Sequence, residues 1–148
     1  MTMEKFPRVR IALLMIEEDK ILLVRHRKGE KTYWLLPGGG LEYGETISEC
    51  AKREALEELS LEIALGDLLF INESIPPDRH RHVLNLYYQA KIIGGQMKLG
   101  DEEVLAEAAW IEIDLIDELT LYPNTREALK KVAKGKKPVK VSLGNLWE

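Results

Sequence analysis

The chain has 148 residues, of which 45% are hydrophobic and 31% charged. That is long enough to bury a substantial core, and we expect a single domain over residues 1–148. A formal net charge of −4 argues against a nucleic acid polymer as partner. The single cysteine, Cys50, excludes an internal disulfide, and no apolar run is long enough for a membrane span. Residues 1–10 show no signal-peptide pattern, so these features predict a cytoplasmic protein.

The first part of the chain predicts a strand hairpin. Residues 8–16 are rich in branched apolar side chains and indicate a strand buried on nearly both faces. Residues 20–25 alternate, and a polar turn at residues 17–19 would join the two strands. Arg25 and Arg27 follow in a basic cluster and are candidate contacts to a substrate phosphate, with a solvated rim as the competing interpretation. A short strand at residues 33–36 then leads into a glycine turn at residues 37–40.

The next element is predicted to be a helix. Thr46 followed three residues later by Glu49 forms a capping box, which marks the N-terminus of a helix. At roughly 100° per residue, Glu54, Glu57 and Glu58 fall within one arc of about 100°. Three carboxylates so close together repel one another, and a divalent cation relieves that repulsion. The arrangement therefore suits the binding of a divalent metal against a phosphate. Cys50 lies on the apolar stripe of this helix and is predicted to be a core residue.

After the helix, the pattern predicts strands again. We expect one long strand or two short ones over residues 61–74 with a break at 66–67, a proline-rich loop at 75–82, and a strong strand at 83–93. A glycine turn at 94–95, a short edge strand at 96–99 and an acidic loop at 100–103 come next. Arg79 and Arg81 in the proline-rich loop are candidate contacts to a substrate phosphate or ribose. A His80-x-His82 metal site is the less favoured alternative.

The last part of the chain predicts a strand at 108–113, a helical turn at 114–119 and a helix at 123–134. Ala128, Leu129 and Val132 are the expected packing residues of that helix. Residues 135–148 form a tail that begins with a basic, frayed stretch, and residues 141–147 are expected to dock weakly.

The stretch from residue 39 to residue 61 resembles a Nudix box. Seven positions match that pattern in register: Gly39, Glu45, Arg53, Glu54, Glu57, Glu58 and Leu61. Two positions depart from it. Ala55 is smaller than the usual aliphatic residue, and Ser60 replaces the closing glycine. If Ser60 is left-handed, it costs about 1 kcal/mol relative to glycine. Neither departure touches a charged position.

The resemblance implies a fold and a metal site. The fold would be α/β, a Nudix-type α/β/α sandwich with a mixed β-sheet. The cofactor would be Mg²⁺, for which Mn²⁺ can substitute. Glu57 and Glu58 resemble the metal ligands of the family, and Glu54 resembles a further ligand or the general base. The backbone carbonyl near Gly38 is a ligand in many relatives.

The resemblance also assigns the remaining candidates. Arg53 would orient a box glutamate, and Glu45 would be structural. A further glutamate often comes from a later loop, here Glu102 or Glu103, with Glu103 preferred on spacing and a solvated loop as the alternative. Many relatives are homodimers, so a homodimer is expected.

The expected reaction is the hydrolysis of a phosphoanhydride in a nucleoside diphosphate linked to another group, X. Pro77 stands sixteen residues after Leu61, as in many ADP-ribose pyrophosphatases, which favours ADP-ribose or a nucleotide sugar as the substrate. Two alternatives stay open. One is a pyrophosphatase for (deoxy)nucleoside triphosphates that cleanses the nucleotide pool, and the other is a non-catalytic nucleotide-binding module. The box keeps all of its glutamates, which favours an enzyme.

Overall fold

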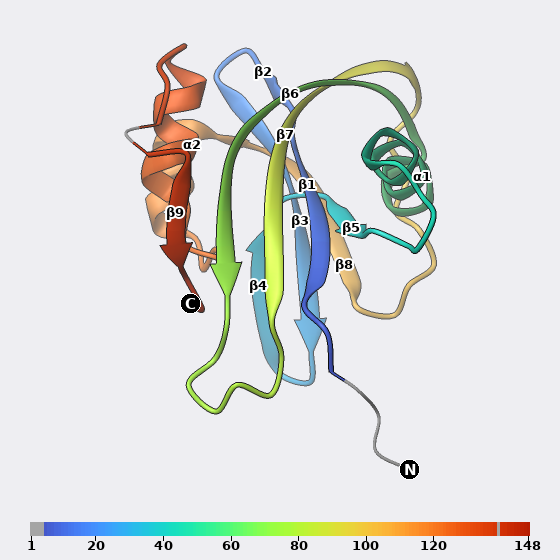
Figure 1. Ribbon diagram of the computed structural model, residues 1–148. Helices are drawn as coiled ribbons and strands as arrows, with labels where there is room; N and C mark the ends of the chain where they lie inside the picture. Colours follow the sequence, from blue (N-terminus) through green and yellow to red (C-terminus); the bar gives the residue numbers. More distant parts are fainter. Residues whose placement is uncertain (1–4, 139) are drawn as a thin grey trace.

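The computed structural model describes residues 5–138 and 140–148 of the chain, and Figure 1 shows the arrangement of their elements. The strands are β1 (Arg8–Leu14), β2 (Ile16–Glu17), β3 (Lys20–Lys28), β4 (Lys31–Leu35), β5 (Gly38–Gly40), β6 (Leu61–Ser74), β7 (Val83–Gly95), β8 (Leu105–Glu112) and β9 (Ser142–Asn145). The helices are α1 (Ile47–Leu59), the 3₁₀ helix η1 (Ile113–Glu118) and α2 (Arg126–Ala133). None of these helices is both long and apolar enough to cross a membrane.

The strands form two sheets. The first is mixed and has the order β5-β1-β7-β6-β9, in which β1 is parallel to β7 and β6 is parallel to β9. In the second sheet β3 is the central strand and pairs antiparallel with β2, β4 and β8. Figure 1 shows α1 and α2 on opposite sides of the strands. The expected α/β architecture, a mixed sheet flanked by helices, is thus confirmed.

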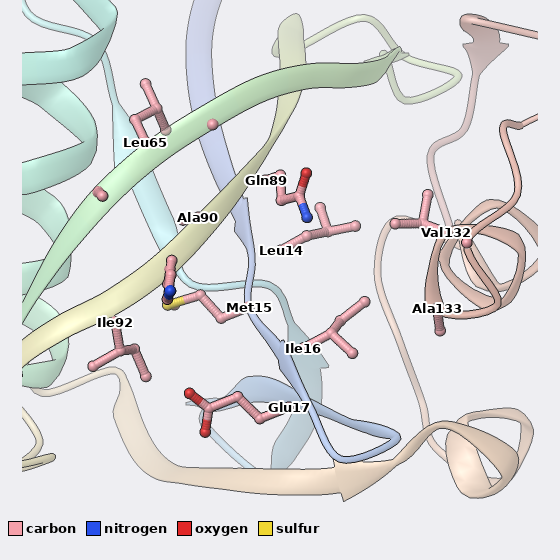
Figure 2. Close-up of a pocket in the computed structure, with 14 residues that line it drawn as sticks. Leu14, Met15, Ile16, Glu17, Leu65, Gln89, Ala90, Ile92, Val132 and Ala133 are labelled. Atoms are coloured by element: carbon pink, nitrogen blue, oxygen red, sulfur yellow. The ribbon is translucent and has the colours of Figure 1, made fainter.

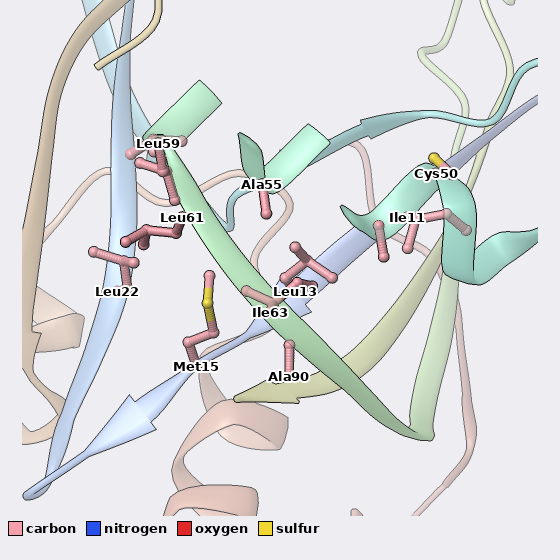
Figure 3. Packing of buried hydrophobic residues seen from close by; sticks show 12 residues of the cluster. Ile11, Leu13, Met15, Leu22, Cys50, Ala55, Leu59, Leu61, Ile63 and Ala90 are labelled. Carbon is pink, nitrogen blue, oxygen red and sulfur yellow. The ribbon is translucent and has the colours of Figure 1, made fainter. Parts of the chain in front are cut away.

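From Ile11 onward both faces of β1 are buried, as its run of branched residues predicts. Ile11 and Leu13 face a cluster beneath α1, which Figure 3 shows together with Cys50 and Ala55. Ala12 and Leu14 face the other way, into a second cluster with Leu129 of α2 and Ile116 of η1. Because side chains alternate along a strand, one buried strand serves two cores and holds the two helices apart.

Helix α1 begins and ends as the local sequence predicts. The Thr46 side chain accepts from the Glu49 amide at 3.1 Å, and the Glu49 side chain accepts from the Thr46 amide at 3.1 Å. At the other end, Ser60 is left-handed, with φ 59° and ψ 30°, and its amide donates to Leu56 at 3.0 Å. The Ser60 hydroxyl also donates to the Lys98 carbonyl at 3.1 Å, which ties the end of α1 to the segment after β7.

Three predictions about the strands are wrong. The predicted hairpin of residues 8–16 with 20–25 does not form, since β1 pairs with β5 and β7, and only Ile16 and Glu17 pair with β3. Gly94 and Gly95 are not a turn, because they continue β7 in register with β6. Residues 96–99 are not a strand. They run along the end of α1, where the Lys98 amide donates to Leu59 at 2.9 Å.

The C-terminal region is also more ordered than the sequence predicts. Helix α2 begins at Arg126 rather than residue 123, although Ala128 and Leu129 pack as expected. Instead of docking weakly, residues 142–145 add a strand to the edge of β6. The Leu146 amide donates to Glu73 at 2.8 Å, and the Ser74 hydroxyl donates to the Leu146 carbonyl at 2.8 Å. Beyond this pairing, the Trp147 ring lies beside His80 and Arg81 of the β6–β7 loop.

Candidate active site

The glycine segment forms strand β5, which lies between β1 and α1. Gly38 has φ +144°, and a Cβ there would lie 1.9 Å from the Ile11 carbonyl oxygen. A Cβ on Gly39 would lie 2.1 Å from the carboxyl carbon of Glu54. Only glycine allows the backbone to approach this closely. The first glycine thus seats the segment on β1, and the second leaves room for a carboxylate of the helix.

Glu58 is the most buried carboxylate of the box. The residue is 7% exposed, and the Gly38 amide donates to its Oε1 at 3.1 Å. Burial raises the pKa of Glu58 to about 7, although the charge of Arg10 and the bond from Gly38 oppose that rise. A bound cation would stabilise the ionised form of this buried carboxylate and lower its pKa.

Glu54 and Glu57, the other two carboxylates of this face, differ in how far their side chains are exposed. The Glu54 side chain is 15% exposed and the Glu57 side chain 55% exposed. Burial raises the pKa of Glu54, and the hydrogen bond from Arg53 opposes the shift. Figure 1 shows the helix that carries these glutamates packed beside β5. The sequence placed the three carboxylates on one face of the helix, and the structure turns that face towards the glycine strand.

Arg53 holds this arrangement in place. Its Nη1 lies 2.7 Å from Glu54 Oε1 and 3.3 Å from Glu57 Oε2, and its Nη2 donates to the Gly40 carbonyl at 3.0 Å. Its Nε donates to Glu45 at 2.6 Å, and this bond lowers the pKa of Glu45 to about 2. One guanidinium therefore joins the loop before the helix, the glycine strand and two box glutamates. This placement fits the orienting role expected for Arg53 and the structural role expected for Glu45.

The acidic loop reaches the same region. The Gly100 amide donates to the Glu58 carbonyl at 2.9 Å, which holds the start of the loop against the end of α1. Of the two later candidates, Glu102 is the residue whose charge raises the pKa of both Glu54 and Glu58. Spacing alone had favoured Glu103, whereas this charge effect supports Glu102, so both residues stay candidates.

The donor chemistry of this cluster fits a hard divalent cation. Its members offer carboxylate oxygens beside the backbone of Gly38, which are the ligands that Mg²⁺ prefers. In residues 5–138 and 140–148, no three His, Cys, Asp or Glu side chains already converge as a metal cage. Within those same residues His80 and His82 are not part of such a cage either, and His80 is instead hydrogen-bonded to Asp78. Cys50 is buried beneath the helix, and burial raises the pKa of its thiol to about 11, so it is a core residue as predicted.

A cleft of about 370 Å³, here called the nucleoside cleft for the role that we propose for it, is lined in part by Arg10. Its polar and aromatic lining is mainly basic but includes one acidic residue, Glu148, and two buried polar residues, Ser74 and Asn85; the others are Arg10, Lys28, Lys31, Tyr33, His80, Arg81, Tyr122 and Trp147. Arg10 connects the cleft to the box, since its charge lowers the pKa of Glu58 and its Nη2 donates to the Leu36 carbonyl at 2.7 Å. Tyr33 and Tyr122 form an aromatic wall with ring centroids 5.5 Å apart.

The structure separates the four arginines predicted to bind substrate. Arg81 lines the nucleoside cleft and also a neighbouring hollow, which Arg79 lines as well. Arg25 and Arg27 line neither of these two hollows. Arg25 is paired with Glu107 at 3.0 Å and lies over the Trp34 ring, and these contacts hold its side chain outside both hollows.

Sequence reasoning missed Arg10, Asn85 and Trp147. The signal for Arg10 was present, because a charged residue in an otherwise apolar strand is unusual. No local signal distinguishes Asn85 or Trp147, which enter the cleft through strand pairing. A separate hollow of about 560 Å³, shown in Figure 2, lies between Leu14, Leu65 and Val132. Its lining is mostly apolar and contains no box residue, so it does not suit a polyanionic substrate.

The chain is similar in sequence to several known proteins. The family model described as "NUDIX domain" matches residues 5–132. An ADP-ribose pyrophosphatase from Methanocaldococcus jannaschii is 34% identical over 102 residues, which cover 68% of this chain and 60% of that protein. A human 8-oxo-dGDP phosphatase is 35% identical over 104 residues, which cover 68% of this chain and 30% of that protein. The chain thus spans less than two thirds of the length of both relatives.

Solved structures show the same fold. A NUDIX hydrolase from Nitrosomonas europaea has a TM-score of 0.76 at 23% identity, covering 90% of this chain and 94% of that one. The matched family model extends from before β1 into the last turn of α2, and it includes the glutamates and most residues that line the nucleoside cleft. The chain therefore belongs to the Nudix hydrolase family.

Proposed function

We propose that this protein hydrolyses the phosphoanhydride of a nucleoside diphosphate linked to X, with ADP-ribose or a nucleotide sugar as substrate. The products would be a nucleoside monophosphate and a phosphorylated X. The observation that carries the proposal is the position of Glu58. Its buried carboxylate lies 3.1 Å from the Gly38 amide and within the electrostatic reach of Arg10, which lines the nucleoside cleft. A nucleotide in that cleft would present its phosphates to the glutamates.

The metal in this proposal is Mg²⁺, for which Mn²⁺ can substitute. Its ligands would be Glu54, Glu57, Glu58 and the carbonyl of Gly38, with Glu102 or Glu103 as a further ligand or as the general base. When bound, the ion would neutralise charge on the phosphate oxygens and acidify a water molecule. Arg53 would fix Glu54 and Glu57 while leaving one oxygen of each free of its hydrogen bonds.

The nucleoside cleft would hold the base and ribose. Tyr33 and Tyr122 offer aromatic faces for stacking, and Trp147 lies at the same cleft. Asn85 is 3% exposed and donates to Ser74 at 3.1 Å, which leaves its amide oxygen available to a donor on the base. Arg10 lies between this cleft and Glu58, where it would neutralise a phosphate oxygen.

A relative supports the second candidate function, hydrolysis of a nucleoside triphosphate. A protein named putative 8-oxo-dGTP diphosphatase from Bacillus subtilis is 27% identical over 131 residues, covering 88% of this chain and 83% of that protein. The two candidates share the glutamates and the cleft. The two candidate substrates differ in the group that leaves when the anhydride is cut, which is a phosphorylated X in the first and pyrophosphate in the second.

The test is product chromatography with Mg²⁺ over a panel of ADP-ribose, nucleotide sugars, and normal and oxidised dNTPs. AMP and ribose 5-phosphate from ADP-ribose would support the first candidate. A nucleoside monophosphate and pyrophosphate from a triphosphate would support the second. We expect Glu58→Gln to lower kcat at least about a hundredfold. Glu118→Gln, an exposed substitution on η1, is the matched control and should be as active as the wild type. If no compound is hydrolysed, the proposal is wrong.

A further inference from the structure

A second cleft, here called the basic cleft, lies next to the nucleoside cleft. It has a volume of about 580 Å³ and is lined by residues 5–8 and 79–82. Its charged lining residues are Lys5, Arg8, Arg79 and Arg81, and His80 and His82 complete its polar surface. No aspartate or glutamate lines it. On a protein with a net charge of −4, so many cations around one hollow are unexpected.

Backbone pairing fixes the two sides of the basic cleft. Arg8 opens β1 and is the register partner of Val83, which opens the parallel strand β7. The Arg8 amide donates to the His82 carbonyl at 2.9 Å, and a turn places the Arg79 amide 2.9 Å from the Pro76 carbonyl. Figure 1 shows the β6–β7 loop and the start of β1 at the same end of the molecule. The cations therefore share one hollow because the sheet brings these segments together.

The positive charge of this cleft is not neutralised within the described part of the chain. Lys5, Arg8, Arg79 and Arg81 form no ion pair with any residue in 5–138 or 140–148. Arg81 lies over the Trp147 ring, 5.9 Å from its centroid. Like charges gathered in a concave site repel one another, and the site focuses their field on a bound anion.

The basic cleft adjoins the path expected for the substrate. His80 and Arg81 line both clefts, so an extension from a bound nucleoside would enter the basic cleft directly. Arg8 and Arg10 point to the same face of β1, about 6.6 Å apart along the strand. Arg8 Nη2 would lie 3.5 Å from a Cβ on Gly40, which places its guanidinium beside the glycine strand. The cations thus continue from Glu58 past Arg10 to Arg8.

We propose that the basic cleft binds a second phosphate of the substrate, carried on the 2′ or 3′ position of the nucleoside's ribose and outside the scissile anhydride. This inference rests on the proposed function, since it extends the nucleoside site. Guanidinium groups bind phosphate oxygens through charge-assisted hydrogen bonds, which the arginines of this cleft have free to offer. The enzyme would then prefer nucleotides with this phosphate over the same nucleotides without it.

Two matched pairs of substrates test the preference: 2′-phospho-ADP-ribose against ADP-ribose, and coenzyme A against dephospho-coenzyme A. For the wild type, we expect kcat/KM to be at least about tenfold higher for the phosphorylated member of a pair that is hydrolysed. The variant Arg8→Gln/Arg79→Gln should bring this ratio close to one. The control Lys136→Gln/Lys137→Gln removes the same charge at the end of α2 and should keep the wild-type ratio. A wild-type ratio of one, or a ratio that survives the Arg8 and Arg79 changes, overturns the inference.

A binding measurement separates this inference from the proposed function. Calorimetry without metal would compare adenosine 2′,5′-bisphosphate with 5′-AMP and with inorganic phosphate. Tighter binding of the bisphosphate that is lost in Arg8→Gln/Arg79→Gln supports the anion site even if no panel compound is hydrolysed. Hydrolysis of ADP-ribose with equal binding of bisphosphate and AMP refutes the anion site alone. Inorganic phosphate that binds as tightly as the bisphosphate would identify a site for free phosphate and would also refute the inference.

Discussion

In this structure the Nε of Arg53 lies 2.6 Å from Oε2 of Glu45, eight residues earlier in the chain, and its Nη2 lies 2.9 Å from Oε1. The bond is bidentate and its partners are largely shielded, with side-chain exposures of 24% and 13%. Glu45 therefore sets the orientation of the guanidinium that contacts Glu54 and Glu57.

Disturbing this pair should lower activity without unfolding the protein. Groups that orient metal ligands typically contribute about 10–100-fold to metal affinity or activity, and we expect Arg53→Lys and Glu45→Gln to lose activity in that range. The measurement is kcat and the Mg²⁺ concentration for half-maximal rate. Glu42→Gln is the matched control, because Glu42 is 70% exposed and 4.0 Å from Arg53. Equal losses from Glu42→Gln and Glu45→Gln would contradict the orienting role.

Neighbouring glycines of β5 should respond differently to alanine. In Gly39→Ala the new Cβ would lie 2.1 Å from the Glu54 carboxyl carbon, so that side chain must move. In Gly40→Ala the nearest atom is Arg8 Nη2 at 3.5 Å, an ordinary contact. We expect Gly39→Ala to lower kcat at least about tenfold, while Gly40→Ala stays within about twofold of the wild type. Circular dichroism would confirm that both variants fold. An active Gly39→Ala variant would exclude a need for Glu54 in its present position.

Ser60 allows the cost of a left-handed residue to be measured. Ser60→Ala loses the bond to the Lys98 carbonyl but keeps a Cβ at φ 59°, and should destabilise the protein by about 0.5–1.5 kcal/mol. Ser60→Gly loses the same bond but relieves the strain, and should be about 1 kcal/mol more stable than Ser60→Ala. Urea denaturation of the variants gives both differences. Equal stabilities would show that the backbone at the end of α1 is not strained.

His26 should make the protein sensitive to acid. Burial, with the charges of Arg10 and Lys28, lowers the pKa of His26 from 6.5 to about 4, and its Nε2 is buried without a hydrogen-bond partner among the described residues. Between those two pH values the unfolded chain binds a proton that the folded protein does not. The free energy of unfolding should therefore fall as the pH drops through this window.

The variant His26→Gln cannot titrate at this position. Relative to the variant, the wild type should lose on the order of 2 kcal/mol between pH 6.5 and about 4. Urea denaturation of both proteins across this pH range measures the difference. Parallel pH profiles would show that His26 does not titrate differently in the folded and unfolded states.

The features of helix α1 that the sequence predicts correctly depend on local interactions. The capping box, the left-handed Ser60 and the single face of Glu54, Glu57 and Glu58 depend on residues within one helix. These three features are determined by hydrogen bonds and side-chain spacing over only a few residues, so they can be predicted directly from the sequence. The failed hairpin shows the limit of such reasoning. Apolar runs at residues 8–16 and 20–25 predict strands, but the partner of β1 is β7, about seventy-five residues away along the chain.

By itself, the sequence determined the family, the box helix and the set of candidate carboxylates, because these follow from residue type and short spacing. Only the tertiary structure decided that the charges of Arg10 and Glu102 shift the pKa of Glu58, and that Trp147 and Arg81 border the nucleoside cleft. Each of these arrangements depends on the pairing of segments that lie far apart in the sequence. Such pairing is selected by the burial of two whole cores, so no short segment of the chain encodes it.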